Sequence, residues 1–392
     1  MKILVVGGGS GGHVTPVVAV VREVLKVRPR AKIEFWTDKK YYKNARKIAI
    51  ENSLDLKIRK LTAGKLRRYT NFTFVTYLQN FDVVLKNVAD FFRTIGGLFQ
   101  SLFRLVKNRP DVIFLKGGYV CLPVGIVAHV LHIPYVIHDS DAAPGLTNRV
   151  LAKHATKIAT GMPLEYYNYP AEKAEWTGIP INPEFSPASE AKQKKLKREL
   201  GFDPEKPLVV VTGGSQGAQH INVALREVLP EVLKMTSLLL VAGRERYPEM
   251  LDLKDYESWE EGELKTNFRM VEFSAEMFKL FGAADIVVSR AGASTMTELS
   301  SMAKAVIMVP NEKLPGYHQV KNAEAYKKAN AAIVVPDDKM FADPQLLHKA
   351  IKRLINHPEE RAELAKNLKK FSKDNAAENL ARTIISVAKE EK

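Results

Sequence analysis

The chain has 392 residues, of which 46% are apolar and 26% are charged, and its formal net charge is +15. A chain of this length and composition folds into two or three domains of ordinary size, which excludes intrinsic disorder and a small disulfide scaffold. The single cysteine, Cys121, cannot form an internal disulfide, so a reducing cytoplasm fits best. The N-terminus runs directly into an apolar segment and a glycine loop, and we expect no signal peptide.

The positive charge is concentrated in the first half of the chain. Residues 1–182 contain 27 Lys and Arg against 13 Asp and Glu, a net charge of +14, whereas residues 183–392 contain 32 against 31. This asymmetry predicts that the first half meets an anionic partner: nucleic acid, a phospholipid surface or a phosphorylated substrate.

The chain opens with a strand, a tight turn and a helix. Residues 3–6 are an apolar run, residues 7–12 are rich in glycine, and residues 14–25 have helical periodicity. The same unit recurs at 208–229, where Gly-Gly-Ser at 213–215 matches Gly-Gly-Ser at 8–10. The repeat predicts two halves that share one architecture.

Further apolar runs alternate with helical segments along the rest of the chain. This alternation predicts an α/β protein with parallel sheets that are covered on both faces. We expect domains at 1–182 and 183–372, and a helix at 373–392 that packs back on the first domain. The additional candidate strands are 33–37, 112–115, 135–138, 157–160, 238–242, 268–271, 286–289, 305–309 and 332–335.

The first glycine loop contains G-x-G-x-x-G, and Glu34 and Asp38 stand about where a ribose-binding acid lies in dinucleotide enzymes. Glycines let backbone N–H groups approach a phosphate at a helix N-terminus. Alone, the loop is compatible with a nicotinamide or flavin enzyme, or with a purely structural turn. The second loop favours two Rossmann-like domains with a cleft between them.

Three further segments carry side chains suited to chemistry. His13 follows the first loop and is a candidate general base, with a noncatalytic helix-terminal histidine as the alternative. Residues 289–298 form a strand end, a glycine turn and a helix start, which offer N–H groups to a diphosphate and the Glu298 carboxylate to a ribose. Residues 317–322 offer amide and imidazole groups to sugar hydroxyls.

Six motifs in register resemble the MurG-type transferases of bacterial peptidoglycan synthesis, and the resemblance covers nearly the whole chain. These enzymes transfer N-acetylglucosamine from UDP-N-acetylglucosamine to undecaprenyl-pyrophosphoryl-N-acetylmuramoyl-pentapeptide, converting lipid I to lipid II. The motifs are Gly-Gly-Ser-Gly-Gly-His at 8–13, Lys-Gly-Gly-Tyr-Val at 116–120, His-Asp-Ser-Asp-x-x-Pro-Gly-Leu-Thr-Asn at 138–148, Gly-Gly-Ser-Gln-Gly-Ala at 213–218, the stretch 290–298, and His-Gln-x-x-Asn-Ala at 318–323.

The resemblance implies an inverting hexosyltransferase of GT-B architecture, with two Rossmann-like domains facing across a cleft and no metal or other cofactor. The implied general base, which takes the proton of the C4 hydroxyl, is His13 or Asp141. In the implied donor site Ser274 and Met277 lie beside uracil, Glu298 on ribose, Ser215 and the backbone of Ala293, Ser294, Thr295, Met296 and Thr297 around the diphosphate, and Gln319 on the sugar. The resemblance also places in the donor site Ser10, Gly11 and Gly12 of the first loop, which face the acceptor pyrophosphate as well. The implied acceptor residues are Gly117, Gly118, Tyr119 and Asn148.

The chain departs from the family pattern at three positions. Asp141 stands where the family often has Asn, Asn182 where it often has Arg, and Tyr317 where it frequently has an acid. Without the arginine, one phosphate contact that the resemblance implies is not expected at position 182, and Asp141 could take over as the base. Asp139-Ser140-Asp141 also matches the D-x-D pattern that holds a metal in the other major glycosyltransferase fold.

Residues 72–106 combine apolar side chains at helical spacing with basic flanks that include Arg93, Arg104 and Lys107. Some of these apolar residues must pack in the core, but their number predicts docking on an anionic membrane leaflet. We therefore expect a peripheral protein on the cytoplasmic face of the plasma membrane, with no nucleic-acid partner. The alternatives are a glycolipid glycosyltransferase or UDP-sugar epimerase of similar fold, a nicotinamide oxidoreductase, and a noncatalytic sugar-nucleotide-binding module.

Overall fold

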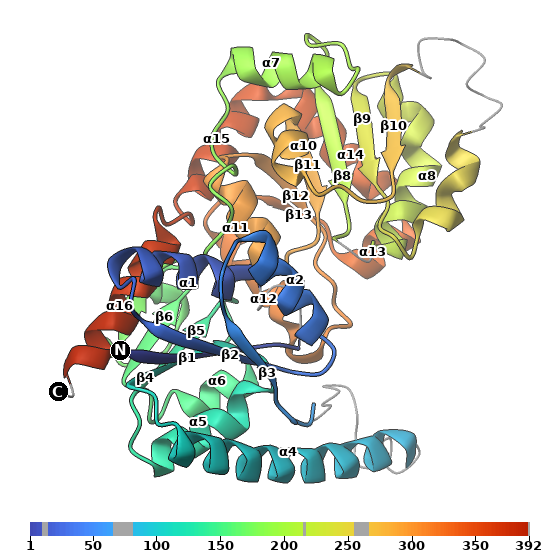
Figure 1. Cartoon of the computed structure of the whole chain (residues 1–392). Helices are drawn as coiled ribbons and strands as arrows, with labels where there is room; N and C mark the ends of the chain where they lie inside the picture. The colour runs from blue at the N-terminus through green and yellow to red at the C-terminus, as the bar shows by residue number, and fades with distance from the viewer. Residues whose placement is uncertain (10–14, 66–80, 215–216, 255–265, 391–392) are drawn as a thin grey trace. The chain divides into compact units, whose positions relative to one another are not determined.

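The computed structural model describes residues 1–9, 15–65, 81–214, 217–254 and 266–390. The chain divides into two compact units (Figure 1). The first unit contains residues 1–182 and 373–392, and the second contains residues 183–372.

The first unit is built on a seven-stranded sheet with the order β3-β2-β1-β4-β5-β6-β7, in which every pair of neighbours is parallel. The strands are β1 (Lys2–Gly7), β2 (Lys32–Thr37), β3 (Lys57–Lys60), β4 (Val112–Gly117), β5 (Tyr135–Asp139), β6 (Lys157–Thr160) and β7 (Ala174–Trp176). The helices are α1 (Thr15–Val27), α2 (Tyr42–Glu51), α4 (Phe81–Lys107), α5 (Cys121–Val130), α6 (Leu146–Leu151) and α16 (Ala376–Glu390), with a short 3-10 turn, η2, at Leu164–Tyr166.

Alternate residues of the central strands enter two separate cores. Val112 and Phe114 of β4 pack with apolar residues of α1 and α16, whereas Ile113 and Leu115 pack with α5 on the other face. The strands are therefore continuous apolar runs, as is typical of parallel sheets covered on both sides. The last helix, α16, belongs to this core, and Thr383 also donates a hydrogen bond to Glu175 Oε2 at 2.9 Å.

The second unit has a six-stranded parallel sheet with the order β10-β9-β8-β11-β12-β13. Its strands are β8 (Leu208–Thr212), β9 (Ser237–Val241), β10 (Phe268–Val271), β11 (Ile286–Ser289), β12 (Ala305–Met308) and β13 (Ile333–Val334). Its helices are α7 (Glu190–Glu199), α8 (Gln219–Leu233), α10 (Met277–Ala283), α11 (Ala293–Ser301), α12 (His318–Lys328), α13 (Asp337–Ala342), α14 (Gln345–Asn356) and α15 (Pro358–Lys369), with 3-10 segments η3 (Tyr247–Lys254) and η5 (Pro315–Tyr317).

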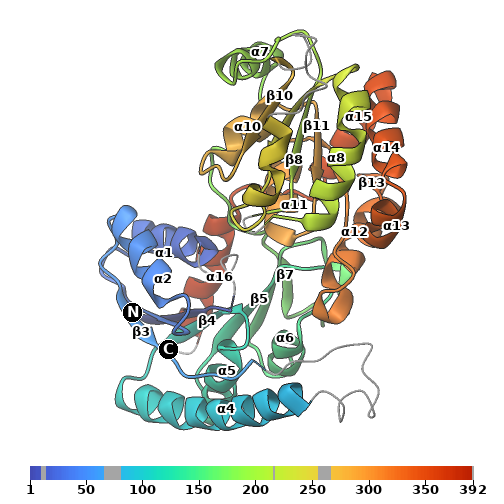
Figure 2. The same ribbon diagram turned by 90° about the vertical axis from the view of Figure 1, so that its right-hand side faces the viewer.

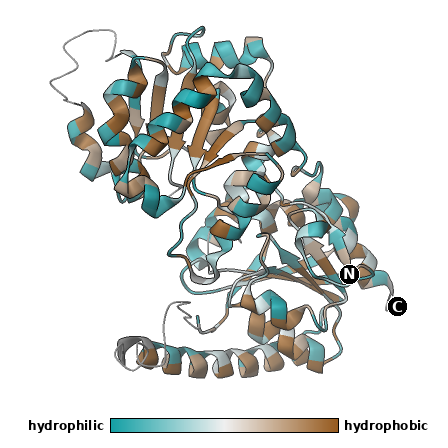
Figure 3. Cartoon of the chain, turned by 180° about the vertical axis from the view of Figure 1, so that it is seen from behind, coloured by the Kyte–Doolittle hydropathy of each residue, from teal (hydrophilic) through white to brown (hydrophobic). Residues whose placement is uncertain are grey.

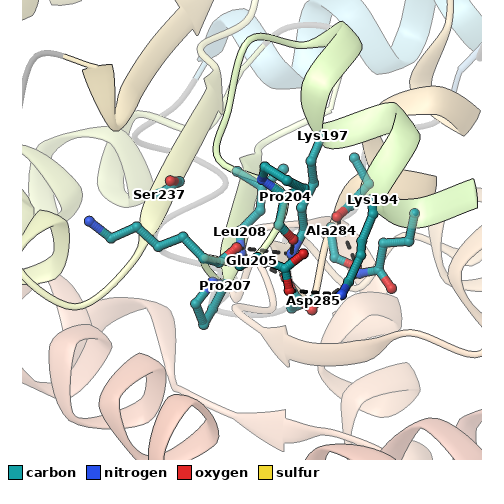
Figure 4. A network of polar contacts seen from close by, with 12 residues as sticks. Lys194, Lys197, Pro204, Glu205, Pro207, Leu208, Ser237, Ala284 and Asp285 are labelled. Atoms are coloured by element: carbon teal, nitrogen blue, oxygen red, sulfur yellow. Dashed lines mark hydrogen bonds and ion pairs between the residues drawn. The ribbon is translucent and has the colours of Figure 1, made fainter. Parts of the chain in front are cut away.

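A network of polar contacts fastens α7 to this sheet (Figure 4). The buried Lys197 ammonium lies 2.7 Å from Asp285 Oδ2 and donates to the carbonyl of Lys206 at 2.9 Å. Asp285 Oδ2 also accepts the backbone N–H of Leu208, the first residue of β8, at 2.7 Å. One carboxylate therefore joins α7 to the starts of β8 and β11.

The longest helix, α4, turns many of its large apolar side chains to solvent. It lies beside α5 in both views of the unit (Figures 1 and 2), and within residues 84–107 its buried positions are Asp90, Gly97, Ser101 and Leu105. A Cβ at Gly97 would stand 2.2 Å from the carbonyl oxygen of Thr62, so the glycine permits close packing. Apolar residues recur along the helix in Figure 3. The exposed ones are Leu85, Val88, Phe91, Phe92, Phe99, Leu102, Phe103 and Val106.

Within the described residues, no helix, α4 included, combines the length and the apolarity needed to span a bilayer.

Candidate functional site

A cavity of about 550 Å³ opens in the second unit at the carboxyl ends of β8 and β11. Its walls come from the second glycine loop, the turn between β11 and α11, and the segment 311–319. Ligands of open parallel sheets bind at this edge, where loops and helix N-termini meet. The two motifs that the sequence analysis assigned to a diphosphate therefore line one cavity.

The second glycine loop needs glycine for steric reasons. Gly214 and Gly217 have φ of +84° and +81°, in the left-handed region. A Cβ at Gly213 would stand 2.2 Å from the backbone nitrogen of Ala218, and one at Gly217 would stand 2.3 Å from the carbonyl oxygen of Ala242. The backbone itself therefore forms the cavity wall here. Ser215, the predicted diphosphate contact, lies outside the described residues.

Helix α11 points an uncapped N-terminus into the region. Its N-cap is Gly292, which has no side chain to accept the first N–H groups, and both Gly292 and Thr295 line the cavity. Unpartnered N–H groups and the helix dipole attract a phosphate. Within the predicted stretch, Met296 and Thr297 are buried, and the Thr297 hydroxyl donates to the carbonyl of Ala293 at 2.9 Å. Ala293, Ser294 and Thr295 are the partly exposed residues of this first turn.

Glu298 follows one turn beyond Thr295, outside the cavity wall; its backbone carbonyl accepts the N–H of Met302 at 3.1 Å, but its side-chain carboxyl forms no hydrogen bond or ion pair with another described residue. Burial raises the pKa of its carboxyl to about 8. A half-buried carboxyl with no protein partner is suited to a ligand that supplies hydroxyl donors.

Of the predicted uracil contacts, Ser274 lies between β10 and α10 and Met277 is the first residue of α10; both are partly exposed. The hydroxyl oxygen of Ser274 accepts the backbone N–H of Glu276 at 3.1 Å. Neither residue lines the cavity.

Gln319 lines the cavity with a fixed amide. Its Oε1 accepts the backbone N–H of Asn311 at 2.9 Å, which leaves the amide nitrogen to donate to a ligand. Arg246 and Lys313 also line the cavity, although no sequence motif identified them. Arg246 lies shortly after β9, and the rule that ligands bind at carboxyl ends of parallel strands could have found it.

A largely buried ion pair between Arg290 and Asp337 lines the cavity. Asp337 accepts from Arg290 at 2.6 Å and lies 3.0 Å from Nδ1 of His220. Among the described residues, His220, Asp337 and Asp338 are the group with metal-ligating atoms close together. Because Arg290 and His220 already occupy the buried Asp337 carboxylate, we interpret the group as an ion-pair network.

In the first unit, Asp38 holds the first glycine loop. Its Oδ2 accepts the backbone N–H of Gly9 at 2.7 Å, and its Oδ1 accepts that of Tyr41 at 3.0 Å. The other acid near the loop, Glu34, forms an ion pair with Arg59 and accepts from Trp36 Nε1. Both acids are thus used within the protein, which disfavours the dinucleotide interpretation. Ser10, Gly11, Gly12 and His13 lie outside the part of the chain that the structure describes.

The predicted acceptor residues lie near the carboxyl ends of β4 and β5. Gly117 and Gly118, with φ of +123° and +86°, turn the chain at the end of β4. Tyr119 then lies against the first loop, because a Cβ at Gly9 would stand 3.1 Å from its ring. Asn148 is buried, and its amide donates to the carbonyl of His138 at 3.0 Å, which gives it an anchoring role.

The D-x-D segment, residues 139–141, begins at the last residue of β5. Asp139 is buried and accepts the hydroxyl of Tyr169 at 2.7 Å. Burial raises the pKa of Asp139 to about 6, against the hydrogen bonds from Tyr169 and Asn148. Asp141 is partly exposed.

Comparison with known proteins places the chain in a family. Residues 3–160 match the glycosyltransferase family 28 N-terminal domain, and residues 208–380 match the glycosyltransferase family 28 C-terminal domain. A solved structure of MurG from Acinetobacter baumannii superposes with a TM-score of 0.72 at 21% identity, covering 98% of this chain and 99% of that one. The calicheamicin glycosyltransferase CalG4 gives 0.63 at 12% identity, over 100% and 98% of the two chains. These likenesses confirm the predicted α/β fold of GT-B type.

The same fold occurs in a UDP-GlcNAc 2-epimerase from Neisseria meningitidis, with a TM-score of 0.65 at 13% identity over 98% of this chain and 100% of that one. Fold alone therefore does not separate transferase from epimerase. Sequence relatives do so. Two proteins named UDP-N-acetylglucosamine–N-acetylmuramyl-(pentapeptide) pyrophosphoryl-undecaprenol N-acetylglucosamine transferase are similar to this chain: one from Thermoanaerobacter sp. (strain X514), 32% identical over 99% of this chain and 100% of the relative, and one from Lachnospira eligens, 33% identical over 88% and 89%. The chain therefore belongs to this family of N-acetylglucosamine transferases, the MurG family.

Proposed function

We propose that this chain transfers N-acetylglucosamine from UDP-N-acetylglucosamine to the C4 hydroxyl of lipid I, forming lipid II for peptidoglycan. The observation that carries the proposal is the uncapped N-terminus of α11 opening on the cavity beside the Gly213–Gly217 loop, in a chain of this family. The substrates are those in the names of its full-length relatives.

The donor is bound by the second unit. The diphosphate oxygens accept hydrogen bonds from the backbone N–H groups in the first turn of α11. The ribose hydroxyls donate to the Glu298 carboxylate, and the Gln319 amide donates to a sugar hydroxyl. Ser274 and Met277 flank the uracil. Preorganised N–H donors stabilise the charge that develops on the departing UDP, and this chemistry requires no divalent ion.

The acceptor is bound by the first unit, at the strand ends that carry Gly117, Gly118 and Tyr119. The C4 oxygen of lipid I attacks C1 of the donor sugar, its proton passes to His13 or Asp141, and the bond between C1 and the diphosphate oxygen breaks with inversion. The leaving group is UDP. A residue with a pKa near neutrality is best matched to this proton transfer.

UDP release measured with and without lipid I tests the proposal. A transferase releases UDP only when lipid I is present, whereas a UDP-sugar epimerase converts the donor without any lipid. Excess EDTA is the second arm: activity persists if helix N-termini stabilise UDP, and it is lost and then restored by Mg²⁺ if the D-x-D segment holds a metal.

The exposed face of α4 supports docking on a membrane. Phe92, Phe99 and Phe103 are 65%, 69% and 70% exposed, which is unusual for phenylalanine outside an interface. A cavity of about 1000 Å³ adjoins Phe103, and Lys2, Lys32, Lys57, Arg59, Arg104 and Lys107 line it together with the acids Glu34 and Asp55. Apolar side chains beside a basic hollow match an anionic leaflet, where the polyprenyl chain of the acceptor resides.

A further inference from the structure

A buried hydrogen-bonded chain joins the ends of β4 and β5. Lys116 is fully buried, and its Nζ lies 3.0 Å from Nδ1 of His138 and 2.7 Å from Oγ of Ser140. The strand register produces this contact: Leu115 pairs with Ile137, so the residues that follow each of them lie side by side. The mechanism above uses none of these three side chains.

The direction of each hydrogen bond follows from donor chemistry. Nε2 of His138 lies 2.9 Å from the carbonyl oxygen of Gly178, which only accepts, so Nε2 carries the proton. A second charge beside a buried ammonium is unfavourable, so His138 is neutral and its Nδ1 is an acceptor. Lys116 therefore donates to both His138 Nδ1 and Ser140 Oγ.

The Ser140 hydroxyl cannot donate a hydrogen bond to Lys116 or to His138. An ammonium has no lone pair, and the lone pair of His138 Nδ1 is taken by Lys116, with Ser140 Oγ farther away at 3.4 Å. The O–H bond of Ser140 must point elsewhere. Ser140 is partly exposed and directly follows β5 at the carboxyl edge of the sheet, as Gly118 directly follows the neighbouring β4, which ends at Gly117.

We propose that Ser140 donates a hydrogen bond to a phosphate oxygen of the lipid I pyrophosphate, and that Lys116 is the positioning residue that holds the Ser140 O–H outward. This inference rests on the proposed function. The Lys116 ammonium also polarises the hydroxyl from behind and places a positive charge near the anion, so that the bond is charge-assisted.

The charge state of Lys116 controls the direction of the hydroxyl. Burial lowers the pKa of Lys116 to about 8, against the attraction of Asp139, Asp141 and Cys121; within the described residues, the neutral His138 also faces it. Above this pH the neutral amine offers a lone pair, and Ser140 can turn its proton inward. The KM for lipid I should therefore rise above pH 8.

Steady-state kinetics of the full chain with UDP-N-acetylglucosamine and lipid I test the inference. Ser140→Ala should raise the KM for lipid I about 10-fold or more, as expected for a charge-assisted hydrogen bond, and leave the KM for the donor unchanged. Ser140→Thr, which keeps the hydroxyl, should restore the wild-type KM. Ser386→Ala is the matched control, because that hydroxyl donates within α16 to the carbonyl of Thr383. The rise in KM above pH 8 should be absent from Ser140→Ala.

A double-mutant cycle that combines Lys116→Met with Ser140→Ala tests whether Lys116 acts by orienting the Ser140 hydroxyl or only through its own charge. The Lys116→Met change should add little to the KM of Ser140→Ala, because both remove the same hydrogen bond. The inference is overturned if Ser140→Ala keeps the wild-type KM and pH profile, or if the two effects add in full. If Lys116→Met fails to fold, the alanine and threonine variants at position 140 decide alone. A wild-type chain that releases no UDP with lipid I contradicts the proposed function and this inference together.

Discussion

The ammonium of Lys197 and the carboxylate of Asp285 form a 2.7 Å ion pair in which the lysine is almost fully buried. The pair connects α7, the first helix of the second unit, to the strands that end at the donor cavity. Removing the lysine takes the buried ammonium from a carboxylate that is 22% exposed and leaves it with neutral donors such as the N–H of Leu208, which is more costly than losing an exposed pair.

We therefore expect Lys197→Met to destabilise the second unit by about 3 kcal/mol, measured by urea unfolding. Lys195→Met on the same helix is the control: Lys195 is 73% exposed, and its ion pair with Glu199 at 3.8 Å should contribute less than about 0.5 kcal/mol. Equal stability of the two variants would contradict the structural role of the pair.

Glu298→Gln should change stability and donor binding in opposite directions. The folded-state pKa of about 8 lies above the usual value of 4.5, so between these values the folded chain binds more protons than the unfolded chain and stability falls as pH rises. Glutamine removes this loss, and we expect Tm at pH 8 to rise by about 2–4 °C, corresponding to about 1 kcal/mol.

The same variant should bind UDP-N-acetylglucosamine about 10-fold more weakly by calorimetry, since the amide is uncharged and has one acceptor oxygen where the carboxylate has two. Wild-type affinity should also increase from pH 6 to pH 8 as the carboxyl ionises, and this increase should vanish in Glu298→Gln. Unchanged affinity would remove Glu298 from the ribose site.

Part of this organisation could be predicted from the sequence. The buried strands of both sheets are continuous apolar runs, so their positions were correctly predicted. The edge strands β3 and β7 were not predicted, because Lys57–Lys60 is mostly charged, Ala174–Trp176 is only three residues long, and neither has an apolar run.

The site was harder to predict than the strands. Glycine loops and a helix start identify a phosphate site because the backbone provides the contacts. Other features of the site depend on contacts between segments that are distant in the sequence, and no local pattern encodes them. These are the burial of Asn148, the hydrogen bond from the Gly9 N–H to Asp38 and the hydrogen bonds of Lys116.

The proton acceptor is assigned by kinetics. His13→Ala should lower kcat about 10²- to 10⁴-fold with little change in donor affinity, as expected for a general base. Asp141→Asn is the matched comparison. If the asparagine variant loses turnover and His13→Ala does not, the base is Asp141.

Membrane docking through α4 predicts a selective loss on vesicles. Replacing Phe92, Phe99 and Phe103 by serine should reduce binding to anionic vesicles at least about 10-fold, because about 2 kcal/mol of apolar burial is lost for each side chain. Binding should also weaken at high salt.

These aromatic positions are better probes than Arg93 and Arg104. Arg93 pairs with the buried Asp90, and Arg104 donates to the carbonyl of Lys60, so charge reversal there would also disturb packing. Ile50→Ser on α2, at a position 70% exposed, is the control. Equal loss of activity on lipid I in vesicles and on a short-chain soluble analogue would contradict docking by this face.

The central claim is that the chain joins N-acetylglucosamine to lipid I. Its most direct test is mass spectrometry of the lipid product after incubation with UDP-N-acetylglucosamine and lipid I, with UDP measured in the same sample. We expect lipid II and UDP to appear in equal amounts, and neither to form without lipid I. Conversion of UDP-N-acetylglucosamine to another UDP-sugar, or UDP release that does not depend on lipid I, would contradict the account.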